Sequence, residues 1–148
     1  PKVWNGLAFS REGARVFVSG GDSGLIHVFK YADGKVTPAD PVQPGPVTPG
    51  NVLGSIAVHP TTGRLYVCNE GNHEVWVLHP DTLALEARIS VGQHPHSCAM
   101  GADNRHLYVS NWGSRSVSLT RPRATLGLSA APNISCSRTS SAGSAGSP

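Results

Sequence analysis

Two histidines separated by a single proline are the residues of this chain best suited to chemistry. His94 and His96 flank Pro95, and two imidazoles held by a rigid proline can point into one site, where imidazole is a common ligand for borderline metals. No third ligand stands at a diagnostic spacing, so a plain loop role for both histidines is the favoured interpretation. We therefore predict no resident metal or cofactor, and His94 and His96 are kept as the one candidate metal pair.

Five further residues in expected loops are candidate ligand-binding residues. They are Asp22, Asn69, Glu70, Asn111 and Trp112. A carboxylate among them could take part in acid–base chemistry, but nothing in the sequence fixes how far apart the side chains lie, so we assign no catalytic residue. Trp112 is either an exposed binding aromatic or a packing residue against a neighbouring sheet, and packing is favoured. The sequence contains no nucleophile-elbow, zinc-protease or phosphate-loop motif.

Three segments of the chain align with one another and indicate what positions these residues. In each segment an alanine is followed nine positions later by an aromatic residue; the pairs are Ala8 and Phe17, Ala57 and Tyr66, and Ala99 and Tyr108. The repeat length is 49 residues and then 42, and the surplus falls in the Pro-rich stretch 38–49, which we interpret as a loop insertion. A period of about 40–45 residues is typical of propeller blades.

Each segment predicts short antiparallel strands rich in Val, Ile, Tyr and Phe and bounded by turn residues. The expected strands lie at 7–9, 16–18 and 25–29, at 56–58, 65–67, 75–78 and 85–91, and at 98–100, 107–109 and 117–119. The second strand of each unit is apolar at successive positions, which predicts cover on both faces. The sequence therefore predicts an all-β fold: a β-propeller fragment of about two and a half four-stranded antiparallel blades. The repeats fall near 4–50, 51–95 and 96–120 within a partial propeller of residues 1–120.

The strand order assigns the loops to two faces of such a propeller. Alternate connections share a side, so the loops between second and third strands emerge together with the loops that join successive blades. All the candidate residues named above fall on this face. We therefore expect an unknown ligand or protein partner to bind there.

The repeat stops after residue 120, and the remaining residues differ in composition. Residues 121–148 are rich in Ser, Ala and Gly and contain no aromatic and no acidic residue. Such a segment offers too little apolar surface to offset the entropy of ordering it. We predict that it is a disordered tail, and because the break falls inside a blade we hypothesise that it is frame-shifted.

Charge, hydropathy and cysteine positions limit the partners and the compartment. The chain has 12 Lys and Arg against 9 Asp and Glu, but Arg121, Arg123 and Arg138 lie in the tail, so the repeat region is neutral and a nucleic-acid surface is excluded. No apolar run approaches the ~20 residues of a membrane-spanning helix. Cys68 and Cys98 fall in expected strands, which predicts buried free thiols. The bare faces of the two end blades predict self-association.

Two of the expected strands resemble a named repeat. Leu65–Asn69 and Leu107–Asn111 are similar to the Leu-Tyr-Val-Thr-Asn strand of the YVTN-repeat β-propellers, and Val91–Pro95 resembles their Val-Gly-x-x-Pro passage between blades. The first repeat departs from this pattern, since Val16–Gly20 replaces the motif. Ser110–Gly113 is closest in style to the propellers fused to alkaline-phosphatase-like phosphoesterases.

The resemblance implies a binding or scaffolding module that is not catalytic by itself and belongs to a periplasmic or secreted protein. A second class stays open. The chain could be part of a lactonase-like propeller enzyme with a metal over the channel, or the propeller half of a phosphoesterase fusion. Fold alone does not decide between these classes, because propellers host unrelated functions.

Overall fold

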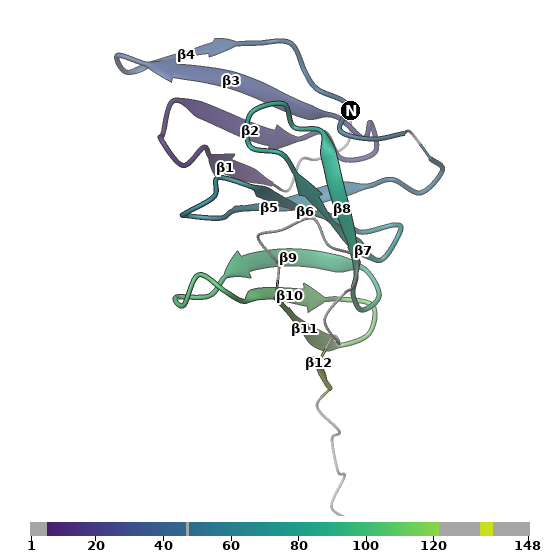
Figure 1. The fold of residues 1–148 in the computed structure, drawn as a ribbon. Coiled ribbons are helices and arrows are strands. Elements are labelled where there is room, and N and C mark those ends of the chain that lie inside the picture. The colour runs from purple at the N-terminus through teal and green to yellow at the C-terminus, as the bar shows by residue number, and fades with distance from the viewer. Residues whose placement is uncertain (1–5, 47, 122–133, 138–148) are drawn as a thin grey trace, which may run out of the picture.

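The computed structural model of the protein describes residues 6–46, 48–121 and 134–137. Every regular element in these residues is a β-strand, and the strands form three four-stranded antiparallel sheets (Figure 1). The first sheet contains β1 (Leu7–Phe9), β2 (Arg15–Ser19), β3 (Ile26–Ala32) and β4 (Lys35–Pro38). The second contains β5 (Leu53–Val58), β6 (Leu65–Asn69), β7 (Glu74–Leu78) and β8 (Leu85–Ser90). The third contains β9 (Pro95–Met100), β10 (Leu107–Asn111), β11 (Ser116–Thr120) and β12 (Ile134–Ser137).

Tight turns join the first two strands of each sheet, as the sequence predicts. Gly13, Gly63 and Asn104 occupy these turns with φ values of 75°, 73° and 54°, in the left-handed region that glycine and asparagine enter most readily. The register places Ala8 opposite Phe17, Ala57 opposite Tyr66 and Ala99 opposite Tyr108. The nine-residue spacing of the sequence is therefore the register of a repeated hairpin.

The three sheets stack face to face, and their first strands lie next to one another (Figure 1). β1 contacts β5, and β5 contacts β9, as the inner strands of neighbouring propeller blades do. One apolar cluster lies between the first two sheets and includes Phe17, Ile26, Leu65 and Trp76. A second lies between the second and third sheets and includes Tyr66, Cys68, Leu107 and Val109.

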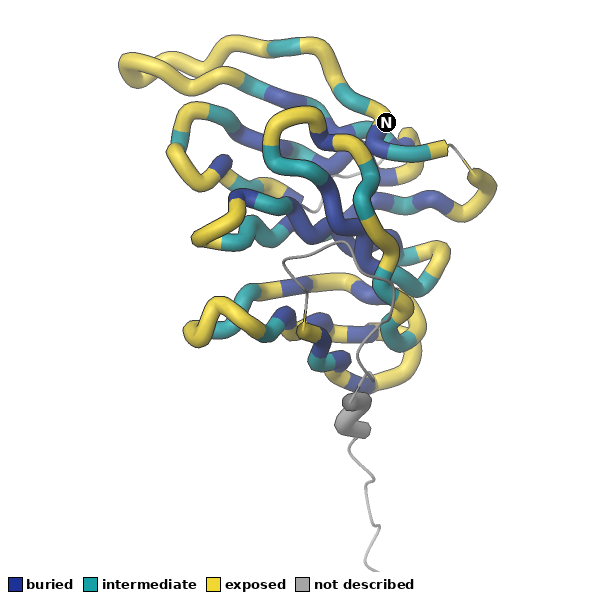
Figure 2. Tube along the Cα trace, viewed as in Figure 1, coloured by how far each residue is buried: buried dark blue, intermediate teal, exposed yellow. Residues whose placement is uncertain are grey.

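The second sheet is covered on both faces because it lies between the other two. Successive residues of β6 point alternately into the two clusters, and all five residues of this strand are buried (Figure 2). The prediction of double burial is thus confirmed for β6. It is wrong for β10, where buried and exposed residues alternate, because in the described part of the chain a sheet packs against only one face of the third sheet. Within the described residues, no membrane-spanning helix is found.

The Pro-rich insertion follows β4, the strand that the sequence could not locate. The chain turns back after Pro38, and Val42 forms an antiparallel bridge with Ile26. The backbone N–H of Leu85 donates to the Pro44 carbonyl oxygen at 3.0 Å. The insertion is therefore held to the first sheet by the Val42–Ile26 bridge and to the second sheet by a backbone hydrogen bond.

The third sheet differs from the sequence prediction at its outer edge. Ile134–Ser137, which lies within the segment predicted to be a tail without strands, pairs antiparallel with Ser116–Leu119 as β12. The free backbone groups along the outer edge of β11 give a returning segment the hydrogen bonds that it needs. The fourth strand of this blade is thus present, and the third blade is not the half blade that the sequence predicts. The remainder of the predicted tail, 122–133 and 138–148, lies outside the described residues.

Candidate functional site

The loops between second and third strands meet the loops between blades at one face, as the strand order predicts. Trp112 N–H donates to the His94 carbonyl oxygen at 2.9 Å, and Gly113 N–H donates to that of Gln93 at 3.0 Å. In the preceding blade, Gly21 forms a backbone bridge with Leu53. We call the face on which these loops meet the loop face; it carries the β2–β3, β6–β7 and β10–β11 loops and the segments that join successive sheets.

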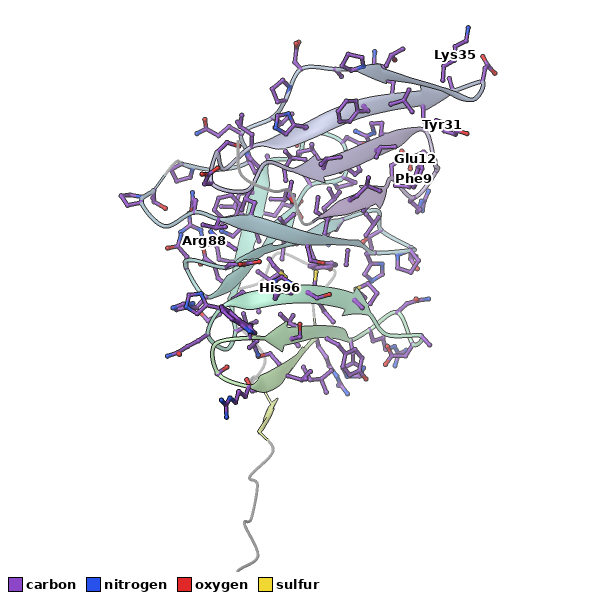
Figure 3. All side chains as sticks on the ribbon, turned by 180° about the vertical axis from the view of Figure 1, so that it is seen from behind. Phe9, Glu12, Tyr31, Lys35, Arg88 and His96 are labelled. Atoms are coloured by element: carbon purple, nitrogen blue, oxygen red, sulfur yellow. The ribbon has the colours of Figure 1, made fainter. Side chains whose placement is uncertain are left out.

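His94 and His96 do not converge on one site. His94 has a φ of 51°, and its ring lies against His73, with ring centroids 4.8 Å apart, and against Trp112, at 6.3 Å. The backbone N–H of His94 donates to Nδ1 of His73 at 3.1 Å. His96 lies on β9 (Figure 3), and its Nδ1 is 3.2 Å from Oε1 of Glu70. The candidate metal pair is thus split between two different sets of neighbours.

The Glu70–His96 pair is the acid–base arrangement of the loop face. The Glu70 side chain is 26% exposed and that of His96 is 57% exposed, so both are open to a small ligand. Gly54 leaves room for the carboxylate, because a Cβ on Gly54 would lie 2.9 Å from Glu70 Oε1. A carboxylate paired with an imidazole at this distance can exchange a proton.

Asn69 and Asn111, both predicted to bind a ligand, are instead buried structural residues. Asn69 is fully buried; its Oδ1 accepts from Val52 N–H at 3.1 Å, and its Nδ2 donates to Asn51 at 3.0 Å. Asn111 is 2% exposed and donates to the hydroxyls of Ser116 and Ser118. Its Oδ1 has no hydrogen-bond partner among the described residues. The sequence alone does not distinguish a buried structural asparagine from a ligand-binding asparagine in a loop.

The other candidates of the loop face have separate surroundings. Trp112 is 79% exposed, which makes the favoured packing role wrong for the described structure. Asp22 is exposed in the β2–β3 loop, and no described contact joins it to Glu70 or His94. Glu74, the first residue of β7, accepts a hydrogen bond at Oε1 from Trp76 Nε1 at 2.6 Å. No group of three His, Cys, Asp or Glu in the described part of the chain is placed to hold a metal ion.

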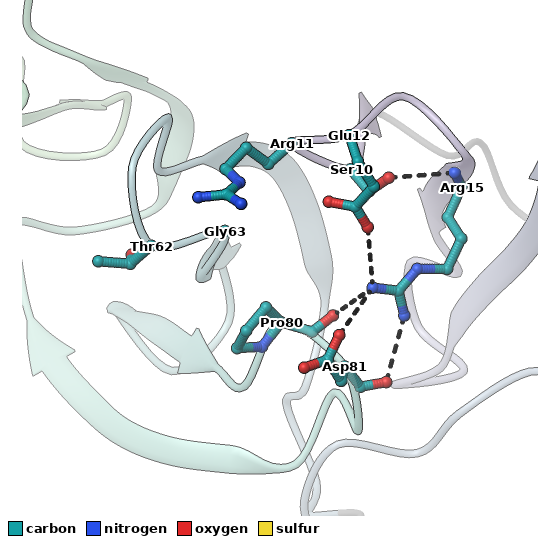
Figure 4. Close-up of a pocket in the computed structure, with 8 residues that line it drawn as sticks. All are labelled: Ser10, Arg11, Glu12, Arg15, Thr62, Gly63, Pro80 and Asp81. Carbon is teal, nitrogen blue, oxygen red and sulfur yellow. Dashed lines mark hydrogen bonds and ion pairs between the residues drawn. The ribbon is translucent and has the colours of Figure 1, made fainter.

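A polar pocket at the opposite face was not expected from the sequence. It has a volume of about 160 Å³ and lies between the first two sheets (Figure 4). Its lining is Ser10, Arg11, Glu12, Arg15, Thr62, Gly63, Pro80 and Asp81. Arg15 dominates it and donates to the Pro80 carbonyl at 2.9 Å, to the Asp81 carbonyl at 3.2 Å and to Asp81 Oδ1 at 3.3 Å.

The Arg15 guanidinium donates its hydrogen bonds to Pro80 and Asp81 of the second sheet. The pocket is therefore a polar contact between the first and second sheets. The guanidinium also lies 5.3 Å from the centre of the Phe17 ring. Arg64 and His106 hold the equivalent position before β6 and β10 and pair with Glu86 and Asp103, respectively. A basic residue immediately before the first apolar residue of each second strand is the sequence signal that could have marked this position.

Several ionisable groups of the hairpins and the core are perturbed. Hydrogen bonds from the Arg105 N–H and from His106 lower the pKa of Asp103 to about 2. Burial raises the pKa of Tyr66 to about 12. Cys68 and Cys98 are buried free thiols, as predicted, and they lie in the same cluster between the second and third sheets. The neighbouring Cys98 thiol and burial raise the pKa of Cys68.

The stacked sheets, the repeated hairpin and the loop face together make this chain part of a β-propeller. The sequence profile of the SMP-30/gluconolactonase/LRE-like region matches residues 2–112. The chain therefore belongs to this family, and the match is not specifically to YVTN repeats. No curated protein matches the chain.

Solved structures agree with this fold. A protein from Lactobacillus plantarum is 26% identical, with a TM-score of 0.73 over 88% of this chain and 41% of its own. A putative 6-phosphogluconolactonase from Bacteroides uniformis is 20% identical, with a TM-score of 0.72 over 88% and 40%. The periplasmic gluconolactonase PpgL of Pseudomonas aeruginosa is 20% identical, with a TM-score of 0.69 over 90% and 40%. The chain thus spans about two fifths of the length of these proteins.

Proposed function

We propose that this chain contributes part of the active face of a propeller that hydrolyses sugar lactones. The observation that carries the proposal is the Glu70–His96 pair, 3.2 Å apart and open on the loop face. Membership of the gluconolactonase-type family supports sugar lactones as the substrate class. The proposal favours the enzymatic alternative of the sequence analysis over a purely scaffolding module.

The pair can supply both proton transfers of lactone opening. Glu70, as the carboxylate, takes a proton from a water molecule whose oxygen attacks the lactone carbonyl carbon. When the resulting tetrahedral intermediate collapses, the ring C–O bond breaks, and His96, as the imidazolium, gives its proton to the departing alkoxide. The product is the open hydroxy acid. A proton then passes from Glu70 to His96 along their hydrogen bond, which restores both groups.

A metal ion, which lactonase-like propellers would imply, does not fit the described residues of this chain. His94 and His96 have different neighbours, and the loop face places no third ligand beside either of them. We therefore route no step through a metal. The proposal depends on the acid–base pair alone.

Acid release from an aldonolactone at constant pH tests the proposal, with the spontaneous opening rate as the baseline. Glu70→Gln and His96→Gln should each lower the catalysed rate by about 100-fold or more, the usual value of a general acid or base. Asp22→Asn is the matched control, because Asp22 lies on the same face outside the pair. A Glu70→Gln variant with the full rate would refute the assigned role. A wild-type rate equal to the baseline would refute the function.

The exposure of Trp112 favours a second, non-catalytic function, in which the loop face binds a sugar ring. A flat indole that is 79% exposed offers an apolar surface for stacking, and the His94 ring lies beside it, with ring centroids 6.3 Å apart. Quenching of Trp112 fluorescence by an aldonolactone that is bound but not opened would favour this binding module.

The motif similarity to YVTN repeats and the periplasmic location of PpgL support an extracytoplasmic location. Fractionation of the native cells tests that location.

A further inference from the structure

The first two strands of each sheet carry equivalent residues on both faces in all three repeats. We call the face toward the next sheet along the chain the leading face and the opposite one the trailing face. The leading faces contain Ala8, Phe17, Ile26 and Val28; then Ala57, Tyr66, Val75 and Val77; then Ala99, Tyr108, Val117 and Leu119. The trailing faces contain Leu7, Phe9, Val16 and Val18; then Ile56, Val58, Leu65 and Val67; then Cys98, Met100, Leu107 and Val109. These residues are all apolar, although the leading face of the third sheet also carries Ser97 and Ser110. The third strands of the trailing faces differ between the repeats: they contribute His27 and Phe29, Trp76 and Leu78, and Ser118 and Thr120.

The two interfaces within the chain are built in the same way. The leading face of the first sheet packs on the trailing face of the second. The leading face of the second sheet packs on the trailing face of the third. Tyr66, on the leading face of the second sheet, is 2% exposed in this position, and Leu65, on its trailing face, is fully buried.

Within the described residues, no sheet packs against the two end faces of the stack, which carry residues equivalent to those of the inner interfaces. Tyr108, the equivalent of Tyr66, is 47% exposed, and Val117, the equivalent of the fully buried Val75, is 43% exposed. At the other end, Leu7 is 63% exposed and Phe9 is 51% exposed. Phe9 packs edge to face with Tyr31, with ring centroids 5.9 Å apart (Figure 3). Exposed apolar faces of this kind mark interaction sites.

We propose that a second copy of this chain covers these faces head to tail. The leading face of the third sheet in one copy packs on the trailing face of the first sheet in the other, so the new contact repeats the two interfaces already present within each chain. The repeat identifies the occupant, because each bare face is equivalent to one whose partner is seen within the chain. Two such contacts, related by a twofold axis, close a ring of six sheets, which is within the ~4–8 blades of propellers.

Single charges placed on the bare faces test the contact without disturbing the core. Tyr108→Lys alters only the leading end face and Leu7→Lys only the trailing end face, and both side chains are already exposed in one chain. The wild-type chain should sediment with twice its mass of 15.4 kDa, and each variant should be a monomer, because a lysine in an apolar interface loses its hydration without gaining a partner. Trp112→Lys, at an exposed loop aromatic outside both faces, should stay dimeric. Circular dichroism establishes that each variant is folded.

Mixing the two variants distinguishes head-to-tail packing from like-to-like packing. The Leu7→Lys chain keeps an intact leading end face, and the Tyr108→Lys chain keeps an intact trailing end face. Their equimolar mixture should therefore form a heterodimer through one contact, although neither variant dimerises alone. A monomeric wild-type chain, a variant that dimerises by itself, a mixture that stays monomeric, or open assemblies larger than the dimer would each overturn the proposal. The outcome is independent of whether the loop face hydrolyses a lactone.

Discussion

Replacing Arg15 by methionine should lower the stability of the chain by about 2 kcal/mol. Met keeps the apolar stem and removes the guanidinium, which donates to the Pro80 and Asp81 carbonyls of the second sheet. Hydrogen bonds from a charged donor contribute roughly 1.5–3 kcal/mol each when shielded, but this side chain is 23% exposed, so we take about half of that. The ion pairs add little, because the Asp81 and Glu12 side chains are 75% and 53% exposed.

Thermal unfolding followed by circular dichroism measures this loss, at one fixed protein concentration so that any association contributes equally. At roughly 3–5 °C per kcal/mol for a domain of this size, Tm should fall by about 6–10 °C. Arg11→Met is the matched control: Arg11 is exposed and makes one hydrogen bond, from Nη1 to the Thr61 carbonyl at 2.6 Å. Its Tm should change by no more than about 2 °C.

The salt dependence of the stability loss caused by Arg15→Met shows which contacts of Arg15 are responsible for that loss. Hydrogen bonds to the two backbone carbonyls are neutral on the acceptor side, so the Arg15→Met effect should persist in 1 M salt, where the Debye length is about 3 Å. An effect that disappears in salt would show that the exposed carboxylates are the main partners. An effect equal to that of Arg11→Met would refute the argument that Arg15 links the sheets.

Three further changes test other parts of the structure. Burial raises the pKa of Tyr66 to about 12, so its stabilising effect is complete below its ordinary value near 10 and is lost as pH rises from there to about 12; Tyr66→Phe should remove that part of the alkaline loss in denaturant titrations. The pKa of Asp103 is lowered to about 2, so its contribution is present above about pH 4 and is lost as pH falls toward 2; Asp103→Asn should flatten the stability profile in that window, and an unchanged slope would refute the pairing with His106. Gly71→Ala would place a Cβ 1.9 Å from the Gly50 carbonyl oxygen, so its midpoint in urea should correspond to a loss of about 3 kcal/mol or more.

Most of the fold could be predicted because the same spacing of residues recurs in three successive segments of the sequence. The spacing from Ala57 to Tyr66 is the register of a hairpin, and the same spacing in the other two repeats shows that one hairpin recurs. The alternation of apolar residues then determines which face each side chain occupies. β12 could not be predicted in this way, because the pairing partner of β11 lies beyond a stretch of chain that carries no repeat signal.

The candidate site could be predicted only in part, since its contacts join residues distant in sequence. The strand order was enough to bring the Glu70 and His96 loops to one face. It could not predict that His94 and His96 diverge, because this depends on the positive φ of His94 immediately before β9. It also could not assign Asn69, whose acceptor and donor contacts reach back 17 and 18 residues to the preceding loop.

The two buried thiols between the second and third sheets allow the opening of that interface to be measured by chemical modification. Cys68 is fully buried and Cys98 is 8% exposed, and each comes from a different sheet. A thiol reagent in water can therefore reach Cys68 only while the two sheets are apart, and the raised pKa of Cys68 disfavours reaction in the closed state. When closure is faster than the chemistry, the modification rate of Cys68, divided by that of a free thiol, equals the fraction of molecules in which the sheets have separated. The two cysteines thus report the opening free energy of a single blade–blade interface, separately from the unfolding of the whole chain.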